Sequence, residues 1–443
     1  MGIVVSFLGM AVLILVAVVL SKNRGAIRLR TVGLAFALQF LIGGLILYVP
    51  WGQQALLTAS DAIGNVINYG REGMNFLFGN LLGSFNVGTF VDGKFVADPD
   101  GSIASTGFIF ALNVLPLIIF FSSLIAVLYY LGIMQRFIRM LGGALQKLLG
   151  TSRAESMSAA ANIFVGQTEA PLVVKPFIKN MTQSELFAVM CGGLASVAGS
   201  VLAGYAGMGV PLPYLIAASF MAAPGGLLFA KLLIPETETP ESNEHMVKTF
   251  AADDEDAPAN VIDAAANGAT TGMYIAMNVG AMLLAFIGLI ALINGMIGGV
   301  GNWFGVEGLS LDQLFGWIFA PVAWIIGTPW ADAQVAGTFL GQKLAINEFF
   351  AYAQLQPYLS GELAGTLSAK TTAILSFALC GFANLSSIAI LVGGLSIMAP
   401  SRRSDVARLG VYALIAGTLS NLMSATIAGL FIGLGGAAAL GVG

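Results

Sequence analysis

Long stretches of this chain contain no charged residue, and this feature restricts the available folds more than any other. The uncharged windows are residues 1–21, 31–60, 101–135, 186–230, 264–306, 371–401 and 409–443. A membrane-spanning helix needs about 20 apolar residues, so several windows can hold one span and some can hold two. Only 9% of the residues are charged, whereas soluble domains carry about 25%. The sequence therefore predicts an all-α polytopic membrane protein.

Positive charges beside the apolar windows set the expected orientation. The first window precedes a basic stretch at 22–30, and because its charges follow the apolar run we interpret it as a retained span and not as a signal peptide. The expected location is the bacterial inner membrane, with both termini in the periplasm. Eight transmembrane helices are expected, over residues 1–21, 31–50, 106–133, 183–206, 212–233, 268–293, 371–398 and 409–436.

Two further apolar segments are interrupted at their centres. Residues 154–179 begin and end among positive charges, so both ends are expected on the cytoplasmic side. Residues 313–346 are broken by a Gly- and Pro-containing turn at 327–332. Each segment is therefore predicted to be a re-entrant hairpin, and the two enter from opposite sides. Similar sequences follow them, at 191–196 and 380–387, which indicates an inverted repeat with broken helices, an architecture of many secondary transporters.

The expected organisation has four parts. They are a scaffold of N-terminal spans and an interfacial segment at 1–105, a first repeat at 106–234 with hairpin 154–179 and broken span 183–206, an acidic cytoplasmic loop at 235–260, and a second repeat at 261–443 with hairpin 313–346, broken span 371–398 and last span 409–436. The chain has one His and two Cys, which excludes a zinc or haem site of ordinary design.

Glu169, at the centre of the first hairpin, is the first candidate for a ligand contact. A carboxylate at bilayer depth costs about 2.5–3.5 kcal/mol on insertion scales, so it is expected to face a cavity or a partner. Gln167 and Thr168 stand beside it. The Gln amide offers an acceptor and two donors in one plane, which suits a nucleobase edge or another amide-like ligand. The alternative is a surface Glu on a hairpin that does not enter the bilayer.

Glu348 is the corresponding carboxylate of the second half. A carboxylate accepts hydrogen bonds from two vicinal hydroxyls, and Asn384 and Ser387 could complete that shell, so a sugar diol is a natural guest. The alternatives are a solvated carboxylate at the interface and, for Asn384 and Ser387, hydrogen bonding between helices. Asp332, at the tip of the second hairpin, is interpreted either as a gate or as a residue that faces the periplasm.

A cation site without a carboxylate is expected beside the first hairpin. Na⁺ prefers oxygen ligands, and the Asn162 amide, the Ser196 hydroxyl and the main chain at Val165 and Val197 would supply them where a helix is broken. The alternative is that these are ordinary small polar residues of a Gly-rich helix bundle.

Several motifs resemble those of concentrative nucleoside transporters. They are GQTEAPL at 166–172, KPF at 175–177, NEF at 347–349 and GFANLSS at 381–387. The resemblance extends from about residue 30 to the C-terminus, and the chain is similar to the sodium-coupled, eight-helix bacterial type.

The resemblance implies a homotrimer in the lipid bilayer, with an elevator-like transport domain built from the two hairpins and the two broken helices. It also implies roles for individual residues: nucleobase binding by Gln167, Thr168, Glu169 and Val201, ribose binding by Glu348, Asn384 and Ser387, pocket lining by Gly166 and Phe382, and sodium binding by Asn162, Val165, Ser196 and Val197. The implied substrates are nucleosides such as uridine, cytidine or adenosine, with sodium co-transported and with no nucleic acid as a partner.

Other classes make different demands on the sequence. A proton-coupled nucleoside carrier or a carrier of another polar metabolite shares the architecture, although Asn162 and Ser196 favour Na⁺. A membrane enzyme should carry a Ser/His, metal-binding or paired-Asp arrangement at membrane depth, whereas the lone His245 lies in a polar loop. A channel would not accumulate its substrate against a gradient. We therefore expect a symporter and not an enzyme.

Overall fold

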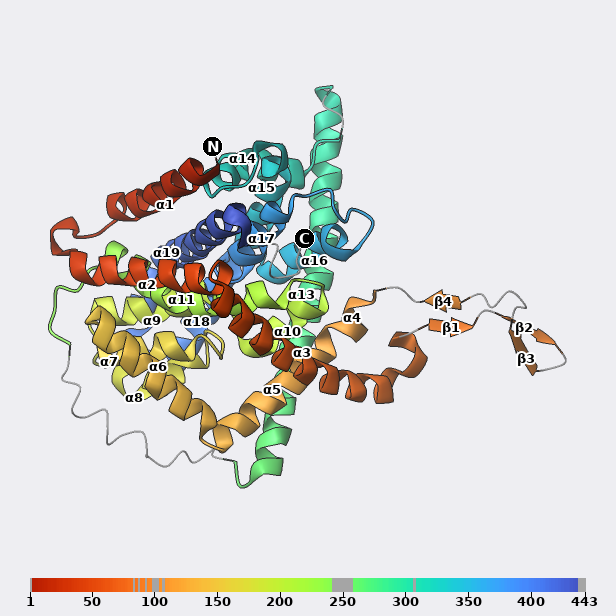
Figure 1. The fold of residues 1–443 in the computed structure, drawn as a ribbon, viewed down its shortest axis with the longest axis horizontal. Helices are drawn as coiled ribbons and strands as arrows, with labels where there is room; N and C mark the ends of the chain where they lie inside the picture. Colours follow the sequence, from red (N-terminus) through yellow and green to blue (C-terminus); the bar gives the residue numbers. More distant parts are fainter. Residues whose placement is uncertain are drawn as a thin grey trace.

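The computed structural model describes residues 2–82, 84–86, 88–91, 94–97, 103–105, 108–240, 258–305 and 308–436. Helices dominate these ranges, as predicted (Figure 1). The α-helices are α1 (Gly2–Val19), α2 (Leu29–Leu47), α3 (Pro50–Phe78), α4 (Phe110–Asn113), α5 (Leu115–Tyr130), α6 (Ile133–Leu149), α7 (Arg153–Ala161), α8 (Lys175–Ile178), α9 (Gln183–Ala195), α10 (Gly199–Gly207), α11 (Leu212–Leu233), α13 (Val261–Trp303), α14 (Leu311–Ile325), α15 (Trp330–Ala345), α16 (Glu348–Ser360), α17 (Ala369–Leu379), α18 (Leu385–Met398) and α19 (Arg403–Phe431). Shorter helical turns are η1 (Arg24–Ala26), η2 (Gly79–Leu82), η3 (Ala170–Val174), η4 (Pro400–Arg402) and η5 (Ile432–Gly436).

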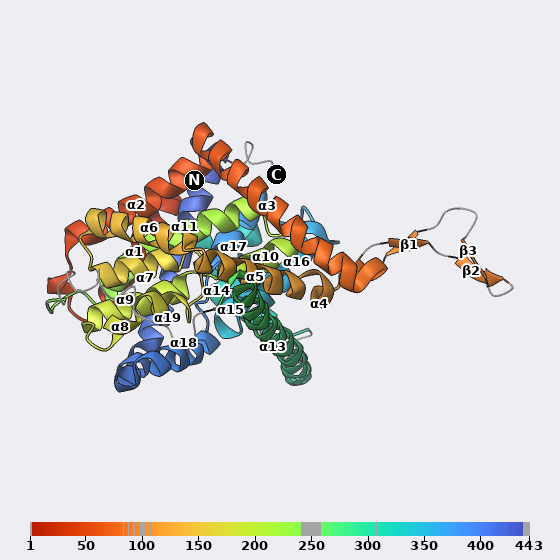
Figure 2. The same cartoon turned by 90° about the horizontal axis from the view of Figure 1, so that it is seen from below.

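Four short strands depart from the all-α expectation. β1 (Ser84–Asn86) pairs antiparallel with β4 (Ile103–Ser105), and β2 (Gly88–Val91) pairs antiparallel with β3 (Lys94–Ala97). Both views place the strands on a projection that stands away from the helices (Figures 1 and 2). They lie within the segment between the second and third predicted spans, where no helical apolar pattern competes with local pairing.

Seven helical segments of the described chain are long and apolar enough to cross a membrane. They are Gly2–Val19, Leu29–Leu47, Phe110–Tyr130, Gln183–Gly207, Leu212–Leu233, Val261–Trp303 and Pro400–Gly435. The span 371–398, which was predicted to be broken, consists of α17 and α18, each shorter than a full span. α13 is 43 residues long and extends well beyond the predicted 268–293, because the bilayer sets only a minimum length for a spanning helix.

Burial separates central helices from peripheral ones. In the apolar window of α11, 94% of the residues are buried, and in that of α19 83% are buried, whereas in α1 and α2 the share is 28% and in α13 it is 17%. Figure 1 shows α13 at the edge of the body, where it packs against α5 and projects beyond it. An apolar helix with so little burial needs lipid or another protein around it, as expected of a membrane protein.

The two predicted hairpins differ in their construction. α14 and α15 are bent by 117° at a short break that contains Gly327, whose φ of +107° favours glycine. In the first hairpin the longest helix is α7, with nine residues, and the chain from 162 to 169 is irregular. α7 starts with a capping box, in which Ser152 N donates to Glu155 Oε1 at 2.6 Å and Glu155 N donates to Ser152 Oγ at 3.4 Å.

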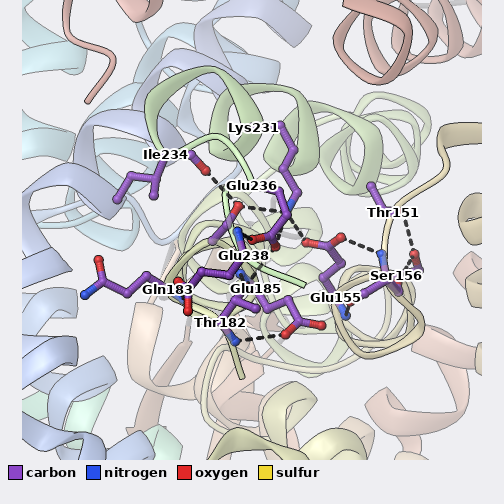
Figure 3. A network of polar contacts seen from close by, with 12 residues as sticks. Thr151, Glu155, Ser156, Thr182, Gln183, Glu185, Lys231, Ile234, Glu236 and Glu238 are labelled. Carbon is purple, nitrogen blue, oxygen red and sulfur yellow. Dashed lines mark hydrogen bonds and ion pairs between the residues drawn. The ribbon is translucent and has the colours of Figure 1, made fainter. Parts of the chain in front are cut away.

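A buried ion-pair network joins α7, α9 and α11 (Figure 3). Lys231 Nζ lies 2.6 Å from Glu155 Oε2 and donates to Ser184 Oγ at 2.9 Å. Glu236, just after α11, accepts from Thr182 Oγ1 at 2.8 Å. The N-terminal ends of α7 and α9 therefore have carboxylates near them, which suits the positive ends of their helix dipoles.

Candidate functional site

Three interruptions in helices lie side by side and form the framework of the site. They are the irregular chain at 162–169, the break at 196–198 between α9 and α10, and the break at 380–384 between α17 and α18. Gly199 N donates to Phe164 O at 2.9 Å, and Phe382 N donates to Ser196 O at 3.0 Å. The two halves of the chain are thus joined through the backbone where helices end and leave polar groups without intrahelical partners.

Glu348 is the buried acid of this framework. Its side chain is 3% exposed and begins α16, where the helix dipole favours a carboxylate. Tyr205 Oη donates to Glu348 Oε1 at 3.0 Å, and Asn384 Nδ2 donates to Glu348 Oε2 at 2.9 Å. Within the described ranges no ion pair involves Glu348. The carboxylate is therefore held by neutral donors and keeps lone pairs for a further donor.

Tyr205 is a site residue that the sequence analysis missed. Its ring is fully buried on α10 and packs against Phe349 and Tyr352, with centroid distances of 4.8 and 4.6 Å. The available signal was its position four residues after Val201, since residues four apart lie on one face of a helix. The same relation places the buried Val201 on the face of α10 that carries Tyr205.

Asn384 and Ser387 form the N-terminal cap of α18. Asn384 Oδ1 accepts from Ser387 N at 2.9 Å and from Ser386 Oγ at 2.7 Å. Because its Oδ1 is occupied in this way, the Asn384 amide presents its Nδ2 group to Glu348. The sequence analysis grouped Glu348, Asn384 and Ser387, and the structure brings these three residues together.

Gln167 connects the first half of the chain to this group. Its Nε2 donates to Ser387 Oγ at 3.4 Å, and its Oε1 is buried without a hydrogen-bond partner among the described residues. Gly193 leaves room for the Gln167 side chain, because a Cβ at Gly193 would lie only 3.0 Å from the Cβ of Gln167. A buried acceptor without a partner is costly and is a natural contact for a donor on a ligand.

Thr168 and Glu169 have different surroundings, although they follow Gln167 directly. The methyl group of Thr168 approaches Gly394 of α18, whereas Glu169 Oε2 accepts from Gly166 N at 3.0 Å. Gly166 also lies close to the ring of Phe382, because a Cβ added at Gly166 would lie 3.9 Å from Cε2 of that ring. Both predicted pocket-lining residues are therefore neighbours beside Glu169.

The four predicted sodium ligands are all buried where the first hairpin meets the break in α9–α10. Asn162 Nδ2 donates to Ser158 O at 3.0 Å, and its Oδ1 has no hydrogen-bond partner among the described residues. Ser196 Oγ donates to Gly192 O at 2.9 Å and keeps its lone pairs. A Cβ at Gly192 would lie 2.9 Å from Asn162 Nδ2, so the two side chains flank the same glycine.

These oxygens suit a hard cation such as Na⁺. Val165 and Val197 add backbone at the same junction. In the part of the chain that the structure describes, no group of three or more His, Cys, Asp or Glu side chains could hold a metal ion. The donor set at this junction is neutral oxygen, which fits an alkali cation better than a transition metal.

Asp332 lies away from these breaks, at the start of α15. Its Oδ2 accepts from Thr371 Oγ1 at 2.6 Å and from Ser368 Oγ at 2.8 Å. Ser368 is the N-cap of α17, so Asp332 fastens the tip of the second hairpin to the start of that helix.

Comparison with known proteins identifies the family. Family models match in three sections: "Na+ dependent nucleoside transporter N-terminus" over residues 8–81, "Nucleoside recognition" over 111–212, and "Na+ dependent nucleoside transporter C-terminus" over 214–429. Nucleoside permease NupC of Helicobacter pylori is 55% identical over 97% of this chain and 98% of its own length. Sodium/nucleoside cotransporter 1 of Mus musculus is 37% identical over 96% of this chain and 63% of its own length.

Solved structures agree with the sequence comparison. The structure of CNTnw in an inward-facing substrate-bound state is 62% identical, covers 98% of this chain and 99% of that chain, and gives a TM-score of 0.88. These relatives are transporters and permeases and not enzymes, as predicted. The chain belongs to the family of concentrative, Na⁺-dependent nucleoside transporters.

Proposed function

We propose that this protein is a symporter that imports nucleosides across a bacterial inner membrane and is driven by a sodium gradient. One observation carries the proposal: a continuous line of contacts runs from Glu348 through Asn384 and Ser387 to Gln167. This line has a carboxylate at one end and an amide at the other. A nucleoside has the matching form, with a diol on its ribose and a planar hydrogen-bonding edge on its base.

Ribose binding is assigned to the second half of the site. The carboxylate of Glu348 would accept from the ribose hydroxyls, while Tyr205 and Asn384 hold it in place. Ser387 would add a hydroxyl contact beside it. Bonds to an ionised acceptor are shorter and stronger than neutral ones, so this end would supply most of the orientation.

Nucleobase binding is assigned to the first half. The Oε1 atom of Gln167 lacks a partner among the described residues and would accept from the base. Thr168 and Glu169 would make further polar contacts, and Val201 would form an apolar wall. Gly166 and Phe382, which are neighbours, would line the rest of the pocket.

Sodium is assigned to Asn162, Val165, Ser196 and Val197. Binding of the ion there would draw the irregular chain at 162–169 against the break at 196–198, which also carries the contact from Ser196 O to Phe382 N. Ion binding would in this way prepare the pocket for nucleoside. Each Na⁺ that enters gains about 2.3 kcal/mol per 100 mV of membrane potential. At one-to-one coupling this energy can sustain a ratio of internal to external nucleoside concentration of about 50.

Movement is assigned to a transport domain that consists of the two hairpins and the two broken helices. The N-terminal spans at 1–105 would be the stationary scaffold. The acidic segment 235–260, of which 241–257 lie outside the described residues, would connect the two repeats on the cytoplasmic side. Little of α13 is buried, which supports contacts with lipid and with other copies in a homotrimer. In this arrangement both termini are periplasmic and the hairpins enter from opposite sides.

The test is uptake of radiolabelled uridine into proteoliposomes, with and without an inward Na⁺ gradient, at fixed pH. Uphill accumulation that requires Na⁺ is the expected result. Uptake that follows a proton gradient and does not depend on Na⁺ would show that the coupling ion is H⁺ and not Na⁺. If a folded preparation takes up no uridine, adenosine or cytidine, the assigned substrate class is wrong.

A further inference from the structure

A buried lysine that the transport proposal does not use lies next to the helix break at 380–384 and is linked through Asn421 to the helix break at 196–198. Lys343, near the end of α15, is 4% exposed. Its Nζ donates to Ala378 O at 2.7 Å and to Asn421 Oδ1 at 2.7 Å. Over the described ranges no carboxylate forms an ion pair with Lys343. Burial of a charge is costly unless other groups compensate it, so this arrangement needs an explanation.

The compensation comes from the C-terminal ends of two helices together with the Glu348 carboxylate, which attracts Lys343 electrostatically although the two form no ion pair. Ala378 lies in the last turn of α17, which ends at Leu379. Asn421, on α19, extends the contact: its Nδ2 donates to Ala195 O at 2.6 Å and to Cys380 O at 3.2 Å. Ala195 is the last residue of α9. Each helix C-terminus carries about half a negative charge, so the end of α17 next to the ammonium and the end of α9 behind Asn421 add to the attraction of Glu348.

The backbone is shaped to admit the Asn421 amide. A Cβ at Gly381 would overlap the amide group of Asn421, so only glycine fits in this part of the second break. One turn earlier on α19, Gly417 allows close packing on Leu194, since a Cβ at Gly417 would stand 2.9 Å from the Cβ of Leu194. The amide is therefore held between both breaks by close packing as well as by hydrogen bonds.

We propose that Lys343, acting through Asn421, is a positioning residue that holds both helix breaks in one arrangement and so couples the sodium site to the nucleoside site. The segment after Ala195 carries Ser196, and the segment after Cys380 carries Asn384. This inference rests on the proposed function, because it concerns the relative positions of the two sites assigned there.

A second buried lysine provides a matched control. Lys231 is also on a helix of the buried core and is 7% exposed, but its partners are Glu155 and Ser184, at the starts of α7 and α9 (Figure 3). It makes none of the hydrogen bonds to the breaks that Lys343 and Asn421 make. Loss of Lys231 should therefore lower stability without loosening the breaks.

The first measurement reports on the break itself and needs no ligand. The chain has two cysteines, both buried, and Cys380 lies at the second break. In a C191S background Cys380 is the single thiol, and its rate of reaction with a maleimide measures how often the break opens. We expect K343Q and N421A to raise this rate about tenfold, the usual effect of losing one charge-assisted hydrogen bond. K231Q should leave it within about twofold while lowering the melting temperature.

The second measurement reports on coupling. We expect K343Q and N421A to raise both the Kd for uridine and the Na⁺ concentration for half-maximal binding, each by about tenfold. K231Q should change neither. A merely structural lysine would lower the melting temperature and leave both constants unchanged.

Each outcome decides something. A Cys380 rate in K343Q and N421A equal to that of the parent overturns the proposal, as does a K231Q rate that rises equally. If K343Q is recovered only as aggregate, N421A carries the same expectations. If the parent binds no nucleoside with or without Na⁺, the proposed function fails, while the Cys380 rates still decide whether Lys343 holds the breaks.

Discussion

Replacement of Glu348 by Gln tests the proposed site most directly, because the surrounding residues can accommodate Gln without a change in the fold. The new Oε1 can accept from Asn384 Nδ2, and the new Nε2 can donate to Tyr205 Oη, so both existing contacts survive as neutral hydrogen bonds. The substitution removes the cost of burying one charge, but it also removes the attraction between Glu348 and Lys343. Because these two effects oppose each other, we expect the melting temperature of E348Q to stay about the same.

The affinity for nucleoside should fall. A carboxylate can accept from two ribose hydroxyls, whereas the Gln amide turns one donor group toward them. One hydrogen bond is lost and the other becomes neutral, which together cost about 2 kcal/mol. This corresponds to a rise of about 30-fold in the Kd for uridine. Equilibrium binding at saturating Na⁺ measures it.

Two controls make the result specific. Glu155 is the matched acid: it is 2% exposed against 3% for Glu348, but it pairs with Lys231. E155Q should lower the melting temperature and leave the Kd unchanged, because the buried Lys231 would keep only the more distant carboxylate of Glu236, at 3.9 Å. For 2′,3′-dideoxyuridine, which lacks the diol, E348Q and the parent should bind alike. An E348Q variant with the parental Kd for uridine, or with an equal loss for dideoxyuridine, would refute ribose recognition by Glu348.

Three further substitutions test the neighbouring roles. Y205F removes one donor to Glu348 and keeps the ring packing, so it should weaken uridine binding by about fivefold, from roughly 1 kcal/mol, and a Kd equal to the parent's would contradict this. N162A removes an amide oxygen from the sodium site, so uptake should need at least about tenfold more Na⁺, and an unchanged Na⁺ titration would remove Asn162 from the site. D332N weakens the cap on α17, so it should lower stability by about 1 kcal/mol in thermal unfolding without changing the Na⁺ titration, and a shift in that titration would indicate a gate instead.

Much of the architecture could be predicted because the bilayer imposes a simple rule. A helix that meets lipid must be apolar over its whole length, so uncharged windows mark the spans. The same rule does not reveal where a span is broken: 371–398 is apolar throughout, and only Gly381 and Asn384 mark the position at which α17 ends and α18 begins. The short strands between 84 and 105 lie outside any apolar window and had no comparable signal.

The candidate site was predictable where residues stood in motifs and not where they stood alone. Glu348, Asn384 and Gln167 were identified from polar runs within apolar sequence, and the structure brings them together. Tyr205 and Asn421 are single residues in apolar helices, and their role depends on contacts with residues distant in sequence. Lys343 did carry a signal, because a lysine within an apolar hairpin is costly and needs a partner. Its hydrogen-bond partners, however, are a backbone carbonyl at a helix end and the Asn421 amide, which no sequence pattern near Lys343 indicates.

The two breaks differ in a way that bears on ion stoichiometry. Beside the break at 196–198, the oxygen of Asn162 in the first hairpin has no hydrogen-bond partner among the described residues, so a mobile cation can be bound there. At the second break the carbonyls of Ala378 and Cys380 are already satisfied by Lys343 and Asn421. A resident ammonium thus supplies the positive charge that a second sodium would bring. We expect uptake to depend on Na⁺ with a Hill coefficient of about one, since coupling to a single ion gives no cooperativity. A coefficient near two in the parent protein would show that the second break, or another place, binds an ion despite Lys343.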